Sequence, residues 1–398
     1  MKSIPFPVWR LTLAYALMMA GTSMTVLIAG IIGTEFAPRP GLATLPIALA
    51  VVGIAASTLP TGRLLHRFGR RRIFVAYAAL ALAAALVVAA SLVIDRFALF
   101  CAGCFLIGWS AAAGHQYRFA ALEAVPAEVA PKATSVLLLG GILGAFIGPE
   151  LAVRGRNLLP VEYAGSYVLL ALNYAVGMLV IAFHRDSAPP SVHHRSQGRP
   201  IVEIIREPVV LLAIVSAALG YGVMSFIMTA TPISMHTHAG HGLEETKIVI
   251  QSHVAGMYLP SLVYAWFQSR LGYRGMLWAG ATGLLICIGV ALADNAFIHY
   301  WAALVILGVG WNFLFLTGTN LLPLGYRPEE RFRVQSMNDF LVFSVQAAVS
   351  LGSGWFLATW QWNGLLWTCV PLIVVFMLVL AVTPRSVLGR RPPLAEPA

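Results

Sequence analysis

Twelve apolar stretches of about 20 residues, separated by short polar segments, constrain this chain more than any other feature of its sequence. A stretch of this length crosses the hydrocarbon core of a bilayer as a helix. Apolar residues make up 59% of the 398 residues and charged residues 11%, a balance that is atypical of water-soluble globular proteins. We therefore expect an all-α integral membrane protein with twelve transmembrane helices, at residues 9–33, 41–62, 73–94, 97–117, 133–153, 163–183, 209–232, 246–268, 275–293, 297–319, 336–359 and 364–383.

The longest polar interruption divides these stretches six and six. Residues 184–208 contain Pro189, Pro190, Gly198 and Pro200, a composition typical of a linker. No segment is large enough for a soluble catalytic domain, and no nucleophile, base and oxyanion group can be assembled from the loops, so an enzyme is not expected. The predicted organisation is an N-terminal half at 1–183, a cytoplasmic linker at 184–208, a C-terminal half at 209–383 and a cytoplasmic tail at 384–398.

Basic residues are distributed unevenly between the two sides of the predicted membrane. Of the 26 Lys and Arg residues, 21 fall on the side that carries the N-terminus, which places both termini in the cytoplasm. This topology accounts for the formal charge of +10, and no nucleic-acid partner is inferred from it. We expect a multi-pass protein of the inner membrane of a bacterial-type cell, in contact with lipid and monomeric by default.

Three short sequences recur at nearly the same interval. The segment 67–71, Arg-Phe-Gly-Arg-Arg, returns at 270–274 as Arg-Leu-Gly-Tyr-Arg, 203 residues later. Gly-Trp at 108–109 returns at 310–311, and Pro-Ala-Glu at 126–128 returns as Pro-Glu-Glu at 328–330, both 202 residues later. Two parallel six-helix repeats enclosing a site near the bilayer midplane are the architecture of a secondary transporter.

The loop at 62–72 resembles the signature loop of the major facilitator superfamily, and the chain fits that family in length and helix number. A glycine lets the chain turn tightly between two helices, and the arginines can bond helix carbonyl ends, so the resemblance implies a conformational latch. The alternative is that the arginines only anchor the topology. Gly140, Gly144 and Gly148 resemble the glycine-rich face that many members use for close helix packing. The predicted latch residues are Gly62, Arg67, Gly69, Arg70, Arg71, Arg270, Gly272 and Arg274.

Methionine and histidine occur four residues apart in two neighbouring apolar stretches. Met224 and Met228 lie in the first, and His253 and Met257 lie in the second. Residues four apart share one helix face, and thioether and imidazole groups favour Cu(I) over Mg²⁺. If the two faces meet, the four side chains would form a descending ladder for copper(I). Methionine also fills gaps between helices and a neutral histidine can bond across them, so a packing role stays open.

The predicted hydrophilic loop between these stretches carries His236, His238 and His241, which either are solvated or gather metal at the outer mouth. The two pairs resemble the Met-x-x-x-Met and His-x-x-x-Met pattern of the copper-importer branch of the superfamily, which also contains riboflavin-transporting relatives. The resemblance implies metal ligation by Met224, Met228, His253 and Met257.

An organic solute would require a different lining. Aromatic rings stack on a flat heterocycle, and amides bond its edge. Trp109 and Trp311 fall mid-helix at equivalent places in the two halves, which favours a central cavity over a role at the membrane interface. The predicted cavity residues are Trp109, Gln116, Tyr117, Tyr221, Tyr258, Trp311 and Asn312.

These patterns predict a secondary active transporter that works by alternating access. Import of copper(I) is the first reading, and import of riboflavin or another small organic solute is the alternative. Drug-like efflux, or an assembly or sensing protein that uses this fold without transport, is a further alternative. No permanently bound cofactor is expected, because copper(I) would be the cargo.

Overall fold

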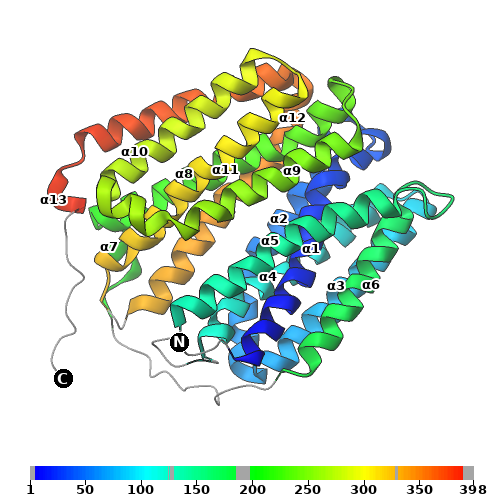
Figure 1. The fold of residues 1–398 in the computed structure, drawn as a ribbon, viewed down its shortest axis with the longest axis horizontal. Coiled ribbons are helices and arrows are strands. Elements are labelled where there is room, and N and C mark those ends of the chain that lie inside the picture. The colour runs from blue at the N-terminus through cyan, green and yellow to red at the C-terminus, as the bar shows by residue number, and fades with distance from the viewer. Residues whose placement is uncertain (1–4, 124, 126–129, 185–197, 328–329, 389–398) are drawn as a thin grey trace. The chain divides into compact units, whose positions relative to one another are not determined.

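A computed structural model describes residues 5–123, 125, 130–184, 198–327 and 330–388, and within these ranges every regular element is a helix (Figure 1). Nine of the described helices are long and apolar enough to cross a membrane. The helices are α1 (Phe6–Phe36), α2 (Leu45–Phe68), α3 (Arg70–Val93), α4 (Phe97–Glu123), α5 (Ala130–Gly155), α6 (Ala164–Ala182), α7 (Ile201–Ile205), α8 (Pro208–Ile233), α9 (Leu243–Tyr258), α10 (Tyr264–Ala293), α11 (Phe297–Leu321), α12 (Arg331–Val382) and α13 (Arg385–Leu388).

Most of the predicted stretches coincide with one helix, but the stretch at 246–268 does not. Helix α9 ends at Tyr258, a 3₁₀ turn occupies Leu259–Leu262, and α10 begins at Tyr264. Pro260 explains the break, because proline has no N–H to donate and its ring clashes with the carbonyl four residues earlier. The prediction of a single helix across 246–268 was therefore wrong.

Two long helices join stretches that were predicted to be separate. Helix α12 contains the stretch 336–359 and nearly all of 364–383, and between them lies a non-helical residue, Gln361, with φ 57°. Helix α10 likewise changes direction at Gly272, with φ 64°. At each of these two positions, a single non-helical residue separates two α-helical segments.

Contacts divide the chain into two compact units. The first contains residues 1–191, 229–251 and 350–359, and the second contains 192–228, 252–349 and 360–398. Helices α8, α9 and α12 each contribute to both units. The unit boundaries therefore fall within helices as well as within the linker.

Glycines bring the helices of the first unit into backbone contact. A Cβ atom added at Gly108 of α4 would lie 1.8 Å from the carbonyl oxygen of Ala50 in α2. One added at Gly53 of α2 would lie 2.7 Å from the backbone nitrogen of Trp109. Side chains larger than hydrogen cannot occupy this crossing, so these two glycines set the position of the α4 segment that carries Trp109.

The glycine-rich face of α5 makes the close contact that its spacing predicts. A Cβ at Gly140, Gly144 or Gly148 would lie within 2.0–2.6 Å of a carbonyl oxygen of α1. The hydroxyl of Ser23 in α1 also donates to the carbonyl of Gly144 at 2.9 Å. Small residues every fourth position thus bring α1 and α5 together along several turns.

In the second unit, α11 is the helix against which its neighbours pack. A Cβ at Gly308 would lie 2.5 Å from the carbonyl oxygen of His253 in α9, and one at Gly318 would lie 2.6 Å from that of Ala213 in α8. Gly280 of α10 and Gly310 of α11 also face each other closely. Helix α11 therefore holds α8, α9 and α10 at short range.

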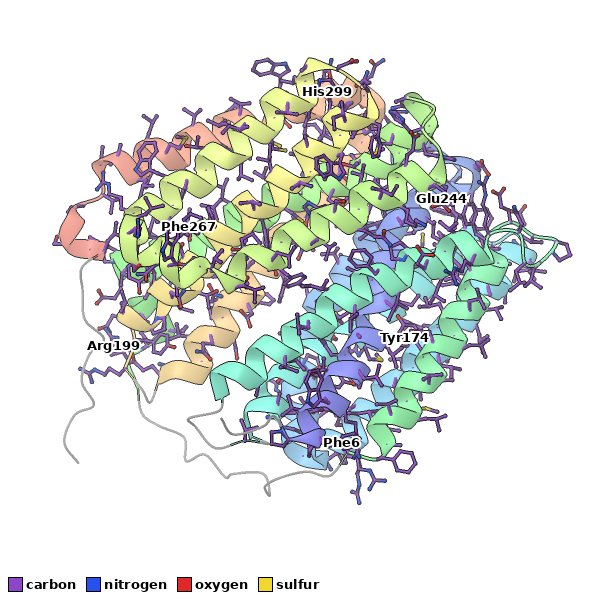
Figure 2. All side chains as sticks on the ribbon, in the orientation of Figure 1. Phe6, Tyr174, Arg199, Glu244, Phe267 and His299 are labelled. Carbon is purple, nitrogen blue, oxygen red and sulfur yellow. The ribbon has the colours of Figure 1, made fainter. Side chains whose placement is uncertain are left out.

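An ion-pair cluster joins α5 to the start of α9 within the first unit. The ammonium of Lys247 lies 2.9 Å from a carboxylate oxygen of Glu150 and 2.6 Å from one of Glu244, which is labelled in Figure 2. One turn along each helix, the Gln251 amide donates to the carbonyl of Phe146 at 3.4 Å. Polar contacts therefore link the two helices across two successive turns.

Reversing the charge of Lys247 is expected to lower the stability of the folded chain. Lys247→Glu would place a third carboxylate beside Glu150 and Glu244, and we expect a loss of about 1 kcal/mol, a small value because the Glu150 side chain is 38% exposed. The double reversal, Lys247→Glu with Glu150→Lys, should recover most of the loss. Thermal unfolding in detergent measures both variants. A double variant as unstable as the single one would contradict the prediction, and Arg154→Ala, at a side chain that is 76% exposed, serves as a neutral control.

Candidate functional site

An aromatic cluster surrounds Trp311 in the second unit. Its ring stacks on that of Phe315, one turn along α11, with centroids 4.9 Å apart and planes inclined by 15°. Tyr221 of α8 meets the edges of Trp311 at 5.1 Å, Phe315 at 5.3 Å and Phe343 of α12 at 5.7 Å. Tyr258, the last residue of α9, lies 6.4 Å from Trp311. Four helices thus contribute rings to one cluster.

Only the central ring of this cluster is fully buried. Trp311 is 2% exposed, whereas Tyr221, Tyr258, Phe315 and Phe343 are half-buried. Half-buried aromatic rings offer faces and edges that a flat organic molecule can contact. The cluster is therefore a candidate binding surface with Trp311 at its base.

Asn312 ties the cluster to the end of α9. Its amide nitrogen donates to the backbone carbonyl of Met257 and to the hydroxyl of Ser261, both at 2.7 Å. These acceptors flank Tyr258 on either side of the helix break at Pro260. Asn312 therefore fixes the backbone that carries the Tyr258 ring.

The sequence pattern selected four of these residues, and the structure brings all four together: Tyr221, Tyr258, Trp311 and Asn312. Phe315, Phe343 and Ser261 were missed. The sequence could have indicated Phe315, because it lies four residues after Trp311 and so shares its helix face. No sequence pattern indicates Phe343 or Ser261, since only tertiary packing brings Phe343 to Tyr221 and Ser261 to Asn312.

The remaining predicted cavity residues lie on α4 in the first unit. Tyr117 is buried, with its ring stacked on Phe74 of α3 at 4.4 Å and inclined to Tyr15 of α1 at 6.2 Å. Trp109 is half-buried and lies 5.9 Å from the ring of Phe105, and Gln116 is half-buried as well. Tyr117 therefore has a packing role between α1, α3 and α4, while Trp109 and Gln116 keep part of their surface free.

The four predicted copper ligands are buried residues of the second unit. Met224 is 4% exposed, and Met228 and Met257 are 8% exposed each. His253 is fully buried and donates from Nδ1 to the carbonyl of Leu304 at 2.7 Å, so Nε2 carries the ring's free lone pair. That nitrogen has no hydrogen-bond partner among the described residues. The ladder itself stays a prediction.

The three histidines between α8 and α9 do not occupy a simple loop. His236 and His238 lie in a π-helical turn, Ser234–His238, that continues α8. Met235 within the turn is fully buried. Outside the turn, His241 and Gly242 precede α9, which begins at Leu243. The predicted hydrophilic loop was therefore wrong for two of the three residues.

The polar atoms of this segment bond to one another. A ring nitrogen of His236 lies 2.9 Å from the carbonyl oxygen of His241, and a ring nitrogen of His241 lies 3.2 Å from a carboxylate oxygen of Glu245. The same carboxylate accepts the backbone N–H of Gly242 at 3.1 Å, which is the second half of a capping box. Among the described residues, no three His, Cys, Asp or Glu side chains gather as a metal site.

The two predicted latch loops share one backbone conformation. Gly69, between α2 and α3, has φ 81° and ψ 162°, and Gly272, within α10, has φ 64° and ψ 175°. Only glycine adopts this region without strain. Arg274 donates to the carbonyls of Ala381 and Thr383 at the end of α12, both at 2.8 Å. The second loop therefore contacts the end of a neighbouring helix in its own unit.

The other latch residues lie at the surface or close to it. Arg67 and Arg270 are exposed and lie over the rings of Phe68 and Trp266 at 5.1 Å and 4.6 Å. Arg71 is exposed and Arg70 is half-buried, and both lie in the first turn of α3. A Cβ at Gly62 would meet open space.

A second polar cluster involves the repeated Pro-Glu-Glu sequence. The carboxylate of Glu330, fully buried, accepts from Nε and Nη2 of Arg199 at 3.0 Å and 2.9 Å. The backbone N–H groups of Arg199 and Arg327 also donate to it, both at 2.9 Å. Arg199, labelled in Figure 2, lies just before α7. Glu330 therefore links Arg199, within the predicted linker at 184–208, to the residues just before α12.

The long apolar helices define a multi-pass membrane protein, and comparison with known proteins identifies its family. A family model described as Major Facilitator Superfamily matches residues 11–350. The riboflavin transporter RfnT of Brucella anthropi is 32% identical over 385 residues, which is 94% of this chain and 96% of that protein. The chain belongs to the Major Facilitator Superfamily, a family of transporters rather than enzymes.

Other relatives agree with this family. Two uncharacterized transporters of the same type from Bacillus subtilis, YddS and YdeG, are 28% and 29% identical over 84% and 85% of this chain, and these matches cover 81% and 83% of those proteins. A bacterial homologue of the human lysosomal transporter Spinster, in an inward-facing and occupied conformation, has a TM-score of 0.73 and 14% identity, covering 97% of this chain and 98% of that one. At that identity the likeness shows the fold alone.

Proposed function

We propose that this chain imports riboflavin, or a closely similar flat organic solute, across a bacterial-type inner membrane. Import would proceed by alternating access between two six-helix halves, with twelve membrane crossings and both termini in the cytoplasm. The observation that carries the proposal is the 32% identity to a riboflavin transporter over nearly the whole length of both proteins. Copper(I), which the sequence pattern favoured as cargo, becomes the second candidate for the transported solute.

The aromatic cluster supports an organic cargo. The isoalloxazine ring of riboflavin is flat and polarisable. Aromatic side chains stabilise the binding of such a ring through offset-stacked or edge-to-face contacts. Tyr221 and Tyr258 bring half-buried rings to the cluster from α8 and α9. Their hydroxyl groups can add polar contacts to a bound solute.

One observation keeps copper(I) as the second candidate. The Nε2 lone pair of His253 is buried in the same helix that carries Met257, and imidazole with thioethers is a ligand set that suits a soft monovalent ion. For a copper importer, Met224 and His253 would be ligands. For a riboflavin importer, the same residues would only pack.

Uptake of the two candidate solutes by cells that express the chain separates these functions. Radiolabelled riboflavin and copper would be measured for the parent, Tyr221→Ala and Met224→Leu. We expect riboflavin uptake to fall about tenfold in Tyr221→Ala, because the variant removes a ring that contacts three others, while Met224→Leu keeps its volume and stays near the parent rate.

The opposite result is equally specific. Copper accumulation in the parent that is lost in Met224→Leu, without riboflavin uptake in either strain, would replace riboflavin with copper(I). The amount of each variant in purified membranes must match the parent, so that lost uptake reports transport rather than folding.

A further inference from the structure

Two neighbouring residues at the base of the aromatic cluster carry buried polar atoms without partners. The Oδ1 atom of Asn312 and the Nε1 atom of Trp311 have no hydrogen-bond partner among the described residues. Their side chains are 1% and 2% exposed. Oδ1 of Asn312 is a hydrogen-bond acceptor and Nε1–H of Trp311 is a donor. The two residues are consecutive in α11.

The orientation of the Asn312 amide is fixed by its bonds. A backbone carbonyl can only accept, so the group that faces the carbonyl of Met257 at 2.7 Å must be the NH₂ group. The second N–H of that group is used by the hydroxyl of Ser261. Both donors are therefore occupied, and the remaining oxygen is an acceptor with two free lone pairs.

Buried polar groups in folded proteins are almost always paired, because a group removed from water without a new partner is costly. An unpaired acceptor and an unpaired donor on consecutive residues are two groups that a ligand edge of opposite polarity would satisfy. The cost of leaving such groups empty is also what lets a site reject ligands that lack the matching groups.

The surrounding rings decide the kind of ligand that can bring such an edge. Tyr258 is half-buried beside Trp311, and Tyr221 is half-buried on the side of α8. Both tyrosines contact the ring of Trp311, so a flat ligand that stacks on them reaches the residue that carries the unpaired donor.

We propose that Asn312 and Trp311 recognise the cyclic imide edge of the transported heterocycle. In this edge an N–H lies between two carbonyl groups, as in the pyrimidine part of isoalloxazine. The N–H donates to Oδ1 of Asn312, and one carbonyl accepts from Nε1–H of Trp311. The inference rests on the proposed function and makes these two residues the determinants of specificity.

Free pyrimidines such as uracil carry the same imide. They have no fused rings to contact Tyr221 and Tyr258, so uracil should compete with riboflavin only weakly. A flavin whose imide nitrogen is methylated keeps every ring and both carbonyls but has no N–H to donate. N3-methylriboflavin is therefore the probe that isolates the contact with Asn312.

The test is competition against radiolabelled riboflavin uptake by cells that express the full chain. For the parent, half-inhibition should require about tenfold more N3-methylriboflavin than unlabelled riboflavin. In Asn312→Leu this ratio should fall to near one, because leucine has no acceptor to leave unpaired. In Trp311→Phe both flavins should weaken by the same factor, since both keep the carbonyl, and the ratio should stay at the parent value.

Ser261→Ala is the matched control, because it removes an acceptor of the Asn312 amide and leaves Oδ1 untouched. It should keep the parent ratio. Equal competition by the two flavins in the parent, or a parent-like ratio in Asn312→Leu, would overturn the inference and leave riboflavin import standing. If Asn312→Leu does not accumulate, the test is Trp311→Phe. Competition by riboflavin and by N3-methylriboflavin that weakens by different factors in this variant would overturn the inference. No riboflavin uptake by the parent would overturn the proposed function as well.

Discussion

Substituting alanine for Gly108 is expected to prevent the chain from accumulating as a folded protein. The added Cβ would lie 1.8 Å from the carbonyl oxygen and 2.7 Å from the Cα of Ala50, and both contacts are with backbone that cannot rotate away. Relief requires α2 and α4 to separate, which we expect to cost about 3 kcal/mol or more. The amount of protein in membranes and its unfolding midpoint in detergent measure the effect.

The same substitution at Gly289 is the matched control. Gly289 also lies inside a long helix, α10, but a Cβ there would meet open space. Alanine favours helix over glycine, so Gly289→Ala should be neutral or slightly stabilising. If Gly108→Ala accumulated and unfolded like the parent, the close crossing of α2 and α4 would be refuted.

Removing the Glu330 carboxylate is expected to have the second large effect. Glu330→Ala deletes the acceptor of four hydrogen bonds and leaves Arg199 without its main counter-charge. Breaking a buried pair from one side costs about 3 kcal/mol, because the remaining charge is left uncompensated. Thermal unfolding in detergent at neutral pH should show the loss. Glu207→Ala, which removes a more exposed partner of Arg199 at 3.4 Å, should cost clearly less.

The pH dependence of stability provides an independent test of the same cluster. Burial disfavours the charged carboxylate of Glu330, but the hydrogen bonds from Arg199 and from the backbone outweigh it and lower its pKa from 4.5 to about 2. A depressed folded-state pKa means that the unfolded chain binds the proton more readily. Glu330 therefore stabilises the fold above about pH 4.5, and this contribution is lost as the pH falls toward 2.

In Glu330→Ala the loss of stability between pH 4.5 and pH 2 should be smaller than in the parent. Detergent-solubilised protein unfolded at a series of pH values gives both profiles. Parallel profiles would show that the carboxylate is not held by Arg199 in this way.

Hydropathy predicted the helical fold because a membrane imposes one rule on the whole chain: apolar stretches of sufficient length must form helices. The break at Pro260 was not predicted, since proline inside a membrane helix is often tolerated and the sequence does not show which donor reaches the carbonyl of Met257 once the helix ends. Asn312 supplies that donor from α11, 55 residues away along the chain. Such compensation is a tertiary property.

The candidate site was only partly visible for a similar reason. The spacing of Met224 and Met228 suggested a function from residue type alone, whereas Phe315 and Phe343 are ordinary apolar residues until packing places them beside Tyr221. Glu330 was noticed only as part of a repeat, and its role as a buried acceptor depends on Arg199, 131 residues earlier. Chemistry that needs partners from distant segments leaves little trace in local sequence.

Gly69 and Gly272 lie in two turns whose backbone conformation only glycine adopts without strain. Their turns have the same geometry 203 residues apart, although most side chains around them differ. Any other residue at either position would carry backbone strain of about 1–3 kcal/mol. At Gly272 that strain would fall on the loop whose Arg274 contacts the end of α12.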